Sequence, residues 1–321
     1  MSVIDDLPKL RYGPGSRAFP HGSEIETIIA EPWYKIDDFW QLEGLIADRE
    51  GRYLYFVDVF GGGVHRIELA TKQYSRVYGP ADFEIGSVKI HKDGRLFLCA
   101  MGNASGVKGG VYAIQPDGGD FETIVDPSEG FVVDDIVFDS QGGFYFTDFK
   151  GFATQNEGGV YYVPPEYNRV IRILGNMAIP NGIALRTDGS ALWITESCYN
   201  RILHVYLAED GASVPPSGAT VACTLSGNLG PDSCCVDSDD NLYVAIYGQG
   251  RFLVLNRNGF PIGEVRLPEA DDGKMLRTTS IAFAKDSDRM FLCSNDGPGG
   301  IGSCIYSARG YAKGHNTFQY Q

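Results

Sequence analysis

Four oxygen-bearing side chains recur at one position of a repeated phrase in this sequence. They are Glu43, Asp134, Asn181 and Asp232, and each begins a short apolar run that leads into a turn rich in Asp and Gly. Carboxylate and amide oxygens are hard ligands, which suit calcium, magnesium or manganese better than zinc or copper. Three carboxylates brought close together would repel one another if no cation lay between them. If these residues meet in space, they could therefore hold a hard dication, with calcium favoured, and such an ion can polarise a carbonyl group.

The phrase occurs six times along the chain. Its copies begin at Glu43, Gly86, Asp134, Asn181, Asp232 and Ser280, which gives successive separations of 43, 48, 47, 51 and 48 residues. Each copy is an apolar strand, a turn and a second apolar strand, and signals for a third and a fourth strand follow it. A period of this length with several strands per repeat is typical of a β-propeller. The sequence therefore predicts an all-β fold, a six-bladed β-propeller with four antiparallel strands per blade.

Propeller geometry explains how the four oxygen-bearing residues could meet. The first strand of each blade lines the central channel, and the second runs antiparallel to it. Starts of first strands and ends of second strands therefore share one mouth of the channel. Second-strand ends add a further group of residues at that mouth: Asp58, Asp148, Glu196, Tyr247 and Asn295. Because side chains alternate along a strand, Asp135 is expected to point away from the face that Asp134 presents.

Six evenly spaced repeats favour a single domain over residues 1–321. Residues 1–22 read as an irregular N-terminal segment. Residues at about 23–30 resemble a fourth strand without a blade of its own, and we expect this segment to close the last blade, because an open ring would expose a sheet edge. The C-terminal segment Thr317–Tyr320 competes for the same place, and the sequence leaves the choice open.

Composition excludes several classes of protein. The net charge of −14 at pH 7 argues against nucleic-acid binding, because no basic stripe is available to contact phosphates. No apolar run reaches membrane-spanning length, so no membrane association is expected. The seven cysteines form no zinc-type spacing and no secretory signal is visible, which favours a reducing, cytoplasmic location. The oligomeric state is left open.

Longer stretches resemble a known family. The most specific are Leu42–Leu45, Ile90–Phe97, Val137–Phe149, Asn181–Leu185, Gly230–Ala245, Met275–Thr279 and Cys293–Asp296. They resemble the SMP-30/gluconolactonase/luciferin-regenerating-enzyme family of six-bladed propellers. The resemblance implies a calcium-dependent lactonase that hydrolyses a small-molecule lactone, a cyclic ester, with magnesium or manganese as substitutes for calcium. It also implies the ligands of the catalytic calcium, namely Glu43, Asp134, Asn181, Asp232 and Ser233, and it gives Asp232 the role of catalytic acid and base.

Some relatives in this family carry a second, structural calcium beside blade two. The matching positions here are Val107, Gly109, Asp126, Glu129 and Phe131. The sequence departs from the family pattern at this site, because Val107 and Glu129 replace hydroxyl residues. Backbone carbonyls at Gly109 and Phe131 could survive such replacements. The second calcium site is therefore implied by the resemblance alone.

Two alternatives to this function remain. The first is a different hydrolase on the same metal site, either a sugar-lactonase of the gluconolactonase type or an esterase or phosphotriesterase. The second is a non-catalytic binding propeller, since propellers host many roles. Aromatic residues expected near the mouth, Phe149, Tyr199 and Tyr247, favour apolar or aromatic lactones over sugars.

Overall fold

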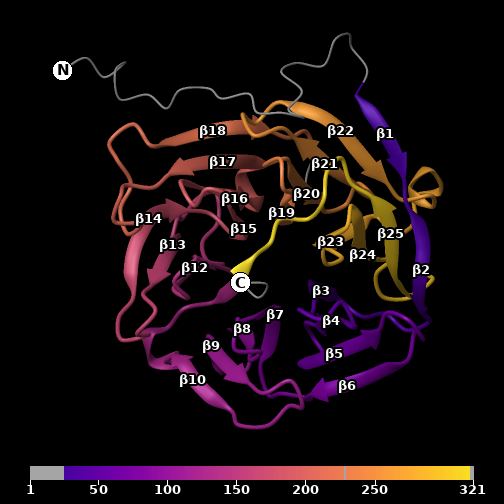
Figure 1. Ribbon diagram of the computed structural model, residues 1–321, viewed down its shortest axis with the longest axis horizontal. Helices are drawn as coiled ribbons and strands as arrows, with labels where there is room; N and C mark the ends of the chain where they lie inside the picture. Colours follow the sequence, from indigo (N-terminus) through magenta and orange to yellow (C-terminus); the bar gives the residue numbers. More distant parts are fainter. Residues whose placement is uncertain (1–24, 228, 319–321) are drawn as a thin grey trace.

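A computed structural model, in which residues 25–227 and 229–318 are described, arranges six β-sheets as blades around a central axis (Figure 1). The expected irregular segment 1–22 lies outside the described residues. The innermost strands of the blades are β3 (Leu42–Ala47), β7 (Glu84–Ile90), β11 (Val133–Phe138), β15 (Pro180–Leu185), β19 (Pro231–Val236) and β23 (Arg277–Phe283). The second strands are β4 (Tyr53–Asp58), β8 (Leu96–Gly102), β12 (Phe144–Asp148), β16 (Ala191–Glu196), β20 (Leu242–Ile246) and β24 (Arg289–Asn295).

The outer half of each blade follows the same antiparallel order. The third strands are β5 (Gly63–Glu68), β9 (Lys108–Ile114), β13 (Gly158–Val163), β17 (Arg201–Tyr206), β21 (Arg251–Leu255) and β25 (Ser303–Arg309). The fourth strands of the first five blades are β6 (Tyr74–Tyr78), β10 (Glu122–Val125), β14 (Ile171–Met177), β18 (Ala219–Thr224) and β22 (Pro261–Arg266). Short 3-10 turns occur at η2 (Pro127–Glu129), η3 (Ser197–Tyr199) and η4 (Ala270–Asp272). The predicted six-bladed, four-stranded β-propeller is confirmed. No helix among the described residues is long and apolar enough to cross a membrane.

The N-terminal segment closes the ring, but in a different place from the one expected. The last blade takes its fourth strand from β2 (Glu31–Ile36), which pairs antiparallel with β25. The preceding strand, β1 (Glu26–Ile29), instead pairs parallel with β22 and adds a fifth strand to blade five. The closing strand is therefore residues 31–36 and not about 23–30. One continuous segment thus ties blades five and six together.

The C-terminal segment lies outside blade six and crosses one mouth of the channel, as the yellow trace in Figure 1 shows. Gly314 forms a bridge with Asp237, in the turn of blade five, and its N–H donates to the Ser287 carbonyl of blade six at 3.0 Å. Phe318, 2% exposed, then packs against His91 and Phe138 of blades two and three. These contacts lie at the turn end of the inner strands, so this segment covers the mouth opposite the four oxygen-bearing residues.

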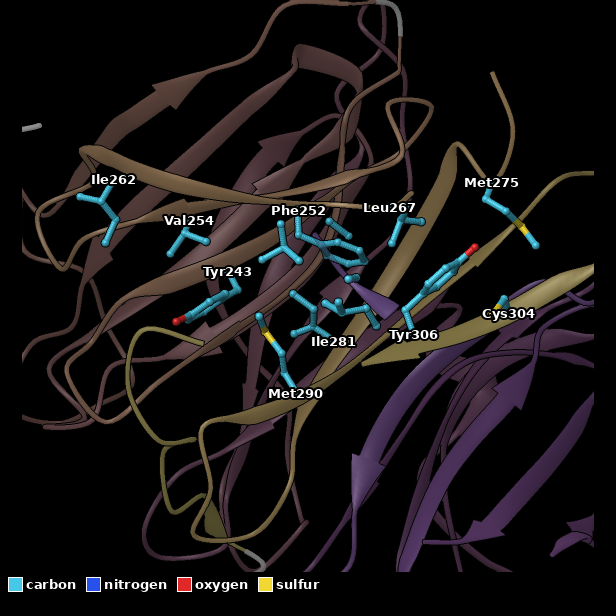
Figure 2. Close-up of a cluster of buried hydrophobic side chains, with 14 residues drawn as sticks. Tyr243, Phe252, Val254, Ile262, Leu267, Met275, Ile281, Met290, Cys304 and Tyr306 are labelled. Carbon is cyan, nitrogen blue, oxygen red and sulfur yellow. The ribbon is translucent and has the colours of Figure 1, made fainter. Parts of the chain in front are cut away.

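Apolar clusters between neighbouring blades make the frame rigid. Figure 2 shows the cluster between blades five and six, where Phe252, Ile281 and Met290 meet two fully buried tyrosines. Each tyrosine hydroxyl has a partner: Tyr243 donates to Asp237 and Tyr306 donates to Glu269, both at 2.9 Å. Buried aromatic residues whose polar ends are satisfied add apolar contact without leaving an unpaired group.

Each inner strand is irregular near its start. Register shifts occur at Glu43/Ile46, Ile85/Ser87, Val133/Ile136, Pro180/Ile183, Pro231/Cys234 and Thr278/Ile281. A bulge breaks the strict alternation of side chains and bends the strand. Gly44 lies at one bulge with φ +60, and a Cβ there would lie 2.6 Å from the backbone nitrogen of Val88. The inner strands therefore approach closely at the level where the oxygen-bearing side chains emerge.

Candidate metal centre

The four predicted ligands occupy equivalent positions at one mouth of the channel. Glu43, Asp134, Asn181 and Asp232 are each the second residue of an inner strand, and all four are buried. The residue five positions later closes the turn of each blade through its backbone N–H, as Asp237 does with Asn241 at 3.0 Å.

This rule corrects the alignment of the sixth repeat. The turn of blade six is closed by the N–H of Ala284, which donates to the Arg289 carbonyl at 2.8 Å. Five positions earlier lies Thr279, so Thr279 and not Ser280 is the equivalent of Glu43.

The three carboxyl groups of this cluster, on Glu43, Asp134 and Asp232, have raised pKa values. Burial raises the pKa of Glu43 well above its usual range, and the charges of Asp232 and Asp134 raise it further. Burial, followed by the charge of Asp232, likewise raises the pKa of Asp134. Burial raises the pKa of Asp232 to about 7, although a hydrogen bond with Asn181 works in the opposite direction. Three buried acids that destabilise each other's charge form an arrangement that a cation would relieve.

The donor chemistry of this cluster fits a hard cation. The side-chain oxygen of Asn181 is buried and has no hydrogen-bond partner. Ser233 Oγ donates to Glu43 Oε2 at 3.3 Å, which brings the fifth implied ligand to the same place. However, no three His, Cys, Asp or Glu side chains in the described part of the chain form a ready metal-binding group. The carboxylates therefore make an electrostatic cluster that a cation would still have to draw together.

Threonines of neighbouring blades hold the backbone of two of these residues. Thr147 Oγ1, on β12, donates to the Asn181 carbonyl at 2.6 Å. Thr195 Oγ1, on β16, donates to the Asp232 carbonyl at 2.7 Å. Both threonines are fully buried. Sequence reasoning missed this role, although the equivalent position of both threonines, just before the last residue of a second strand, was a usable signal.

Asp135 faces the neighbouring inner strand β7 rather than the ring. Its Oδ1 accepts from Ser87 Oγ at 2.9 Å and pairs with Lys89 Nζ at 2.8 Å. Burial acts to lower the pKa of the Lys89 ammonium, but the charge and hydrogen bond of Asp135 outweigh it, and the pKa is raised. The charge of Asp135 nevertheless adds to the raised pKa of Glu43 and of Asp134. Lys89 lines a cavity of about 510 Å³ that continues the channel below this level.

The acids at the ends of second strands lie at the same mouth, but their carboxylates accept hydrogen bonds from backbone N–H groups of the loops. Asp58 accepts from the backbone N–H of Gln41 at 3.1 Å, and Asp148 accepts from that of Val132 at 2.8 Å. Glu196 accepts from the N–H of Ala178 at 2.7 Å. Each N–H lies just before the inner strand of the same blade. These acids therefore fix the entry into the inner strands.

The second predicted calcium site stays a prediction. Asp126 and Glu129 are exposed on the loop around η2, where Asp126 Oδ1 accepts from the N–H of Ser128 at 2.8 Å. A Cβ on Gly109 would lie 2.6 Å from the Phe131 carbonyl oxygen, so these two backbone segments are neighbours. The carbonyl of Val107 accepts from the N–H of Asn103 at 2.9 Å.

Comparison with known proteins gives one family and one fold. The sequence profile described as SMP-30/Gluconolactonase/LRE-like region matches residues 42–296. The chain is 47% identical to lactonase drp35 of Staphylococcus aureus strain USA300 over 326 aligned positions, covering 100% of both chains. Regucalcin from Agrobacterium tumefaciens, described as a calcium-binding protein, has a similar structure (TM-score 0.73, 16% identity, 91% of this chain and 98% of that one). So does a gluconolactonase from Xanthomonas campestris (TM-score 0.68, 17% identity, 94% and 99%). At these identities the two structures show the shared fold.

Proposed function

The chain belongs to the SMP-30/gluconolactonase/LRE-like family, and on that premise we propose that it is a lactonase that hydrolyses small cyclic esters. The observation that carries the proposal is the cluster of Glu43, Asp134, Asn181 and Asp232, buried together at the open mouth of the channel in a chain 47% identical to a lactonase. Three buried acids whose charges act on one another at one point favour a reactive centre over a binding propeller without catalysis.

We propose Glu43, Asp134, Asn181, Asp232 and Ser233 as the residues that would hold a calcium ion, with magnesium or manganese as substitutes. The unpartnered oxygen of Asn181 and the crowded carboxylates support this assignment. When bound, such an ion supplies positive charge that offsets the carboxylates and polarises a lactone carbonyl.

Asp232 is our candidate for proton transfer. Without a cation its pKa is raised to about 7. Because a bound dication lowers a carboxylate pKa, Asp232 needs one oxygen free of the ion to accept and donate a proton near neutral pH. As a carboxylate it accepts a proton from the water whose oxygen bonds to the carbonyl carbon. As an acid it returns a proton to the ring oxygen when the carbon–oxygen ring bond breaks, and the product is a hydroxy acid. The hydrogen bond with Asn181 and the backbone bond from Thr195 hold Asp232 in place for both transfers.

The loops of this mouth favour apolar substrates. Phe60 and Phe152 follow second strands of blades one and three and are 64% and 66% exposed. Tyr199 lies on the same side, where its hydroxyl donates to the Ala153 carbonyl at 3.0 Å. Exposed aromatic rings can cover an apolar ring system, so we propose aromatic or alkyl lactones as the substrate class, ahead of sugar lactones.

A substrate panel with metal analysis tests the proposal. Purified protein is assayed on an aromatic lactone, an aldonolactone, an aryl ester and an aryl phosphotriester, with and without a chelator. We expect hydrolysis of the aromatic lactone, loss with the chelator, and recovery when calcium is restored. Turnover that a chelator leaves unchanged would refute the metal assignment, and turnover of none of the lactones would refute the lactonase itself.

A cytoplasmic location is also proposed. Each of the seven cysteines is free, as expected in a reducing compartment.

A further inference from the structure

Tyr247 and Arg277 are held side by side at the mouth that carries the acidic cluster. Tyr247 follows β20, whose last residue pairs with Pro231 beside Asp232, and Arg277 is the first residue of β23. Two hydrogen bonds tie their flanking residues together. Thr278 Oγ1 donates to the Ile246 carbonyl at 2.8 Å, and the N–H of Gly248 donates to the Leu276 carbonyl at 2.9 Å. The two side chains therefore emerge from adjacent, fixed positions of blades five and six.

The side chains of this pair also contact each other. The Arg277 guanidinium lies close enough to the Tyr247 hydroxyl to lower its pKa, through its charge first and then through a hydrogen bond. Burial raises the pKa of Tyr247, and the charges of Asp232 and Glu43 add to this effect while Arg277 opposes it. The pair thus borders the carboxylates of the candidate metal centre.

The guanidinium of Arg277 packs against Gly297, and this glycine is called its seat. A Cβ on Gly297 would lie 2.7 Å from Arg277 Cζ, 2.8 Å from Nη2 and 2.9 Å from Nη1. Three nearly equal distances mean that the flat face of the guanidinium covers this glycine. The glycine is itself fixed, because its N–H donates to Asn295 Oδ1 at 3.0 Å. Its φ of +75 also favours glycine at this position.

Arg277 carries a charge that the described acids leave without an ion-pair partner. Within residues 25–227 and 229–318, no Asp or Glu forms an ion pair with Arg277. Asp296, its neighbour across the loop, accepts instead from the backbone N–H groups of Met275 and Ile301, both at 3.0 Å. A positioned guanidinium without a carboxylate partner is available for an anionic ligand.

We propose that Arg277 binds the carboxylate that is released when the lactone ring opens, and that Tyr247 and Gly297 position its guanidinium for this purpose. The inference rests on the proposed lactonase activity. Ring opening turns a neutral ester into a hydroxy acid that is ionised at neutral pH, inside a mouth that already carries three acids. The planar fork of Arg277 can donate two parallel N–H bonds to the product carboxylate. Arg277 therefore sets how tightly the product is held and how strongly it inhibits the next turnover.

The test measures inhibition by the product. The probe is the hydroxy acid obtained by opening an aromatic lactone with alkali, added to assays of that lactone. Arg277→Gln should raise the inhibition constant about tenfold or more, which corresponds to the loss of about 1.4 kcal/mol of binding. Arg277→Lys should restore part of the effect, because it returns the charge without the fork. The KM for the neutral lactone should change by less than about threefold, since that substrate carries no carboxylate.

Three further variants separate positioning from folding. Tyr247→Phe and Gly297→Ala keep Arg277 but remove its hydrogen bond or its seat, so both should weaken product inhibition by about two- to fivefold. Arg289→Gln is the matched control, because Arg289 lies at the opposite end of β24, over the Phe291 ring and against Ser307. It should leave the inhibition constant unchanged. Thermal melts of every variant confirm that the compared proteins are folded.

The outcomes keep this inference separate from the lactonase proposal. If the wild-type chain hydrolyses lactones but Arg277→Gln retains the wild-type inhibition constant, the role of Arg277 is refuted while the activity stands. If the wild-type chain hydrolyses none of the lactones, the activity is refuted, and direct titration of the hydroxy acid by calorimetry then decides on Arg277. Absence of measurable binding to the wild-type chain in that titration would refute the anion site as well.

Discussion

Thr195 Oγ1 donates a hydrogen bond of 2.7 Å to the backbone carbonyl of Asp232, so a side chain of blade four fixes the candidate catalytic residue of blade five. The same hydroxyl accepts from the N–H of Gly182 at 2.7 Å, within its own blade. The arrangement of the site therefore depends on contacts between blades, and a small shift of one inner strand would move a neighbouring ligand.

Thr195→Val tests this dependence. The substitution keeps the shape of the side chain but leaves the Asp232 carbonyl and the Gly182 N–H without their partner. We expect a loss of stability of about 1–3 kcal/mol, because buried polar groups would be unsatisfied. We also expect at least a tenfold fall in kcat/KM for the lactone. Thr220→Val is the control, since Thr220 lies on the outer strand β18 and donates to the His204 carbonyl of β17. Wild-type kcat/KM in folded Thr195→Val would contradict the role of this bond.

Asp232→Asn should nearly abolish hydrolysis while the fold is retained. The amide has the same size as the carboxyl group but cannot accept and return a proton, and loss of such a group typically costs 100- to 10,000-fold in rate. Asp232→Ala should be inactive as well. Initial rates on the preferred lactone at saturating calcium measure both effects. Turnover at the wild-type rate in both variants would eliminate Asp232 as the proton-transfer group.

Asn181→Leu should weaken calcium binding. The side-chain oxygen of Asn181 is buried without a hydrogen-bond partner, so the substitution removes an oxygen that is free to bind the ion. The only hydrogen bond it breaks is the one with Asp232. We expect the dissociation constant for calcium, measured by calorimetry, to rise about tenfold, as the loss of about 1.4 kcal/mol would produce. An unchanged dissociation constant would mean that Asn181 does not bind the ion.

The metal-free protein should lose stability as the pH rises from about 4 to about 7. Within this window the folded state keeps a proton on Asp232, whose pKa is raised from 3.8 to about 7, while the unfolded state releases it. Because the folded state binds more protons, the free energy of unfolding falls with rising pH, by at most about 1.4 kcal/mol per pH unit for one group. The raised pKa values of Glu43 and Asp134 act in the same direction.

Denaturant unfolding at pH 5 and pH 7.5 in the presence of a chelator measures this effect. Saturating calcium should reduce the fall, because a cation favours the ionised carboxylates. Asp232→Asn should show a smaller fall than the wild-type chain, since it lacks one of the titrating groups. A metal-free stability that is constant or rises over this range in the wild-type chain would contradict the prediction.

Phe318→Ala should destabilise the fold without affecting the chemistry. Phe318 is 2% exposed and packs against Phe138 and His91 at the mouth opposite the acidic cluster. Removal of a buried phenyl ring typically costs about 3–5 kcal/mol. Thermal and denaturant unfolding measure the loss, and kcat at low temperature should match the wild-type value. Phe121→Ala is the control, because Phe121 is 47% exposed and its removal should cost less than about 1 kcal/mol. A loss of activity in folded Phe318→Ala would show that this segment also serves the site.

Local features of the sequence were sufficient for much of the fold and for placing four residues of the candidate site at one mouth of the channel. The alternation of apolar residues predicts each strand. Regularly spaced turns divide the chain into six copies of the same strand pattern, and this repetition predicts a six-bladed propeller with four-stranded blades. Glu43, Asp134, Asn181 and Asp232 were identifiable because they occupy the same position of the repeat, and a closed ring of blades must bring equivalent positions to one mouth.

Other features were decided only by the tertiary structure. The sequence indicated one closing strand at about residues 23–30, whereas the closed ring assigns residues 26–29 to blade five and uses residues 31–36 to complete blade six. Asp135 contacts Ser87 and Lys89 of the neighbouring inner strand, and these partners come from another blade that the local sequence does not identify. The pairing of Tyr247 with Arg277 joins residues of different blades, and the seat on Gly297 depends on how a loop folds back. Contacts between remote segments depend on side-chain packing, which produces no periodic pattern in the amino-acid sequence.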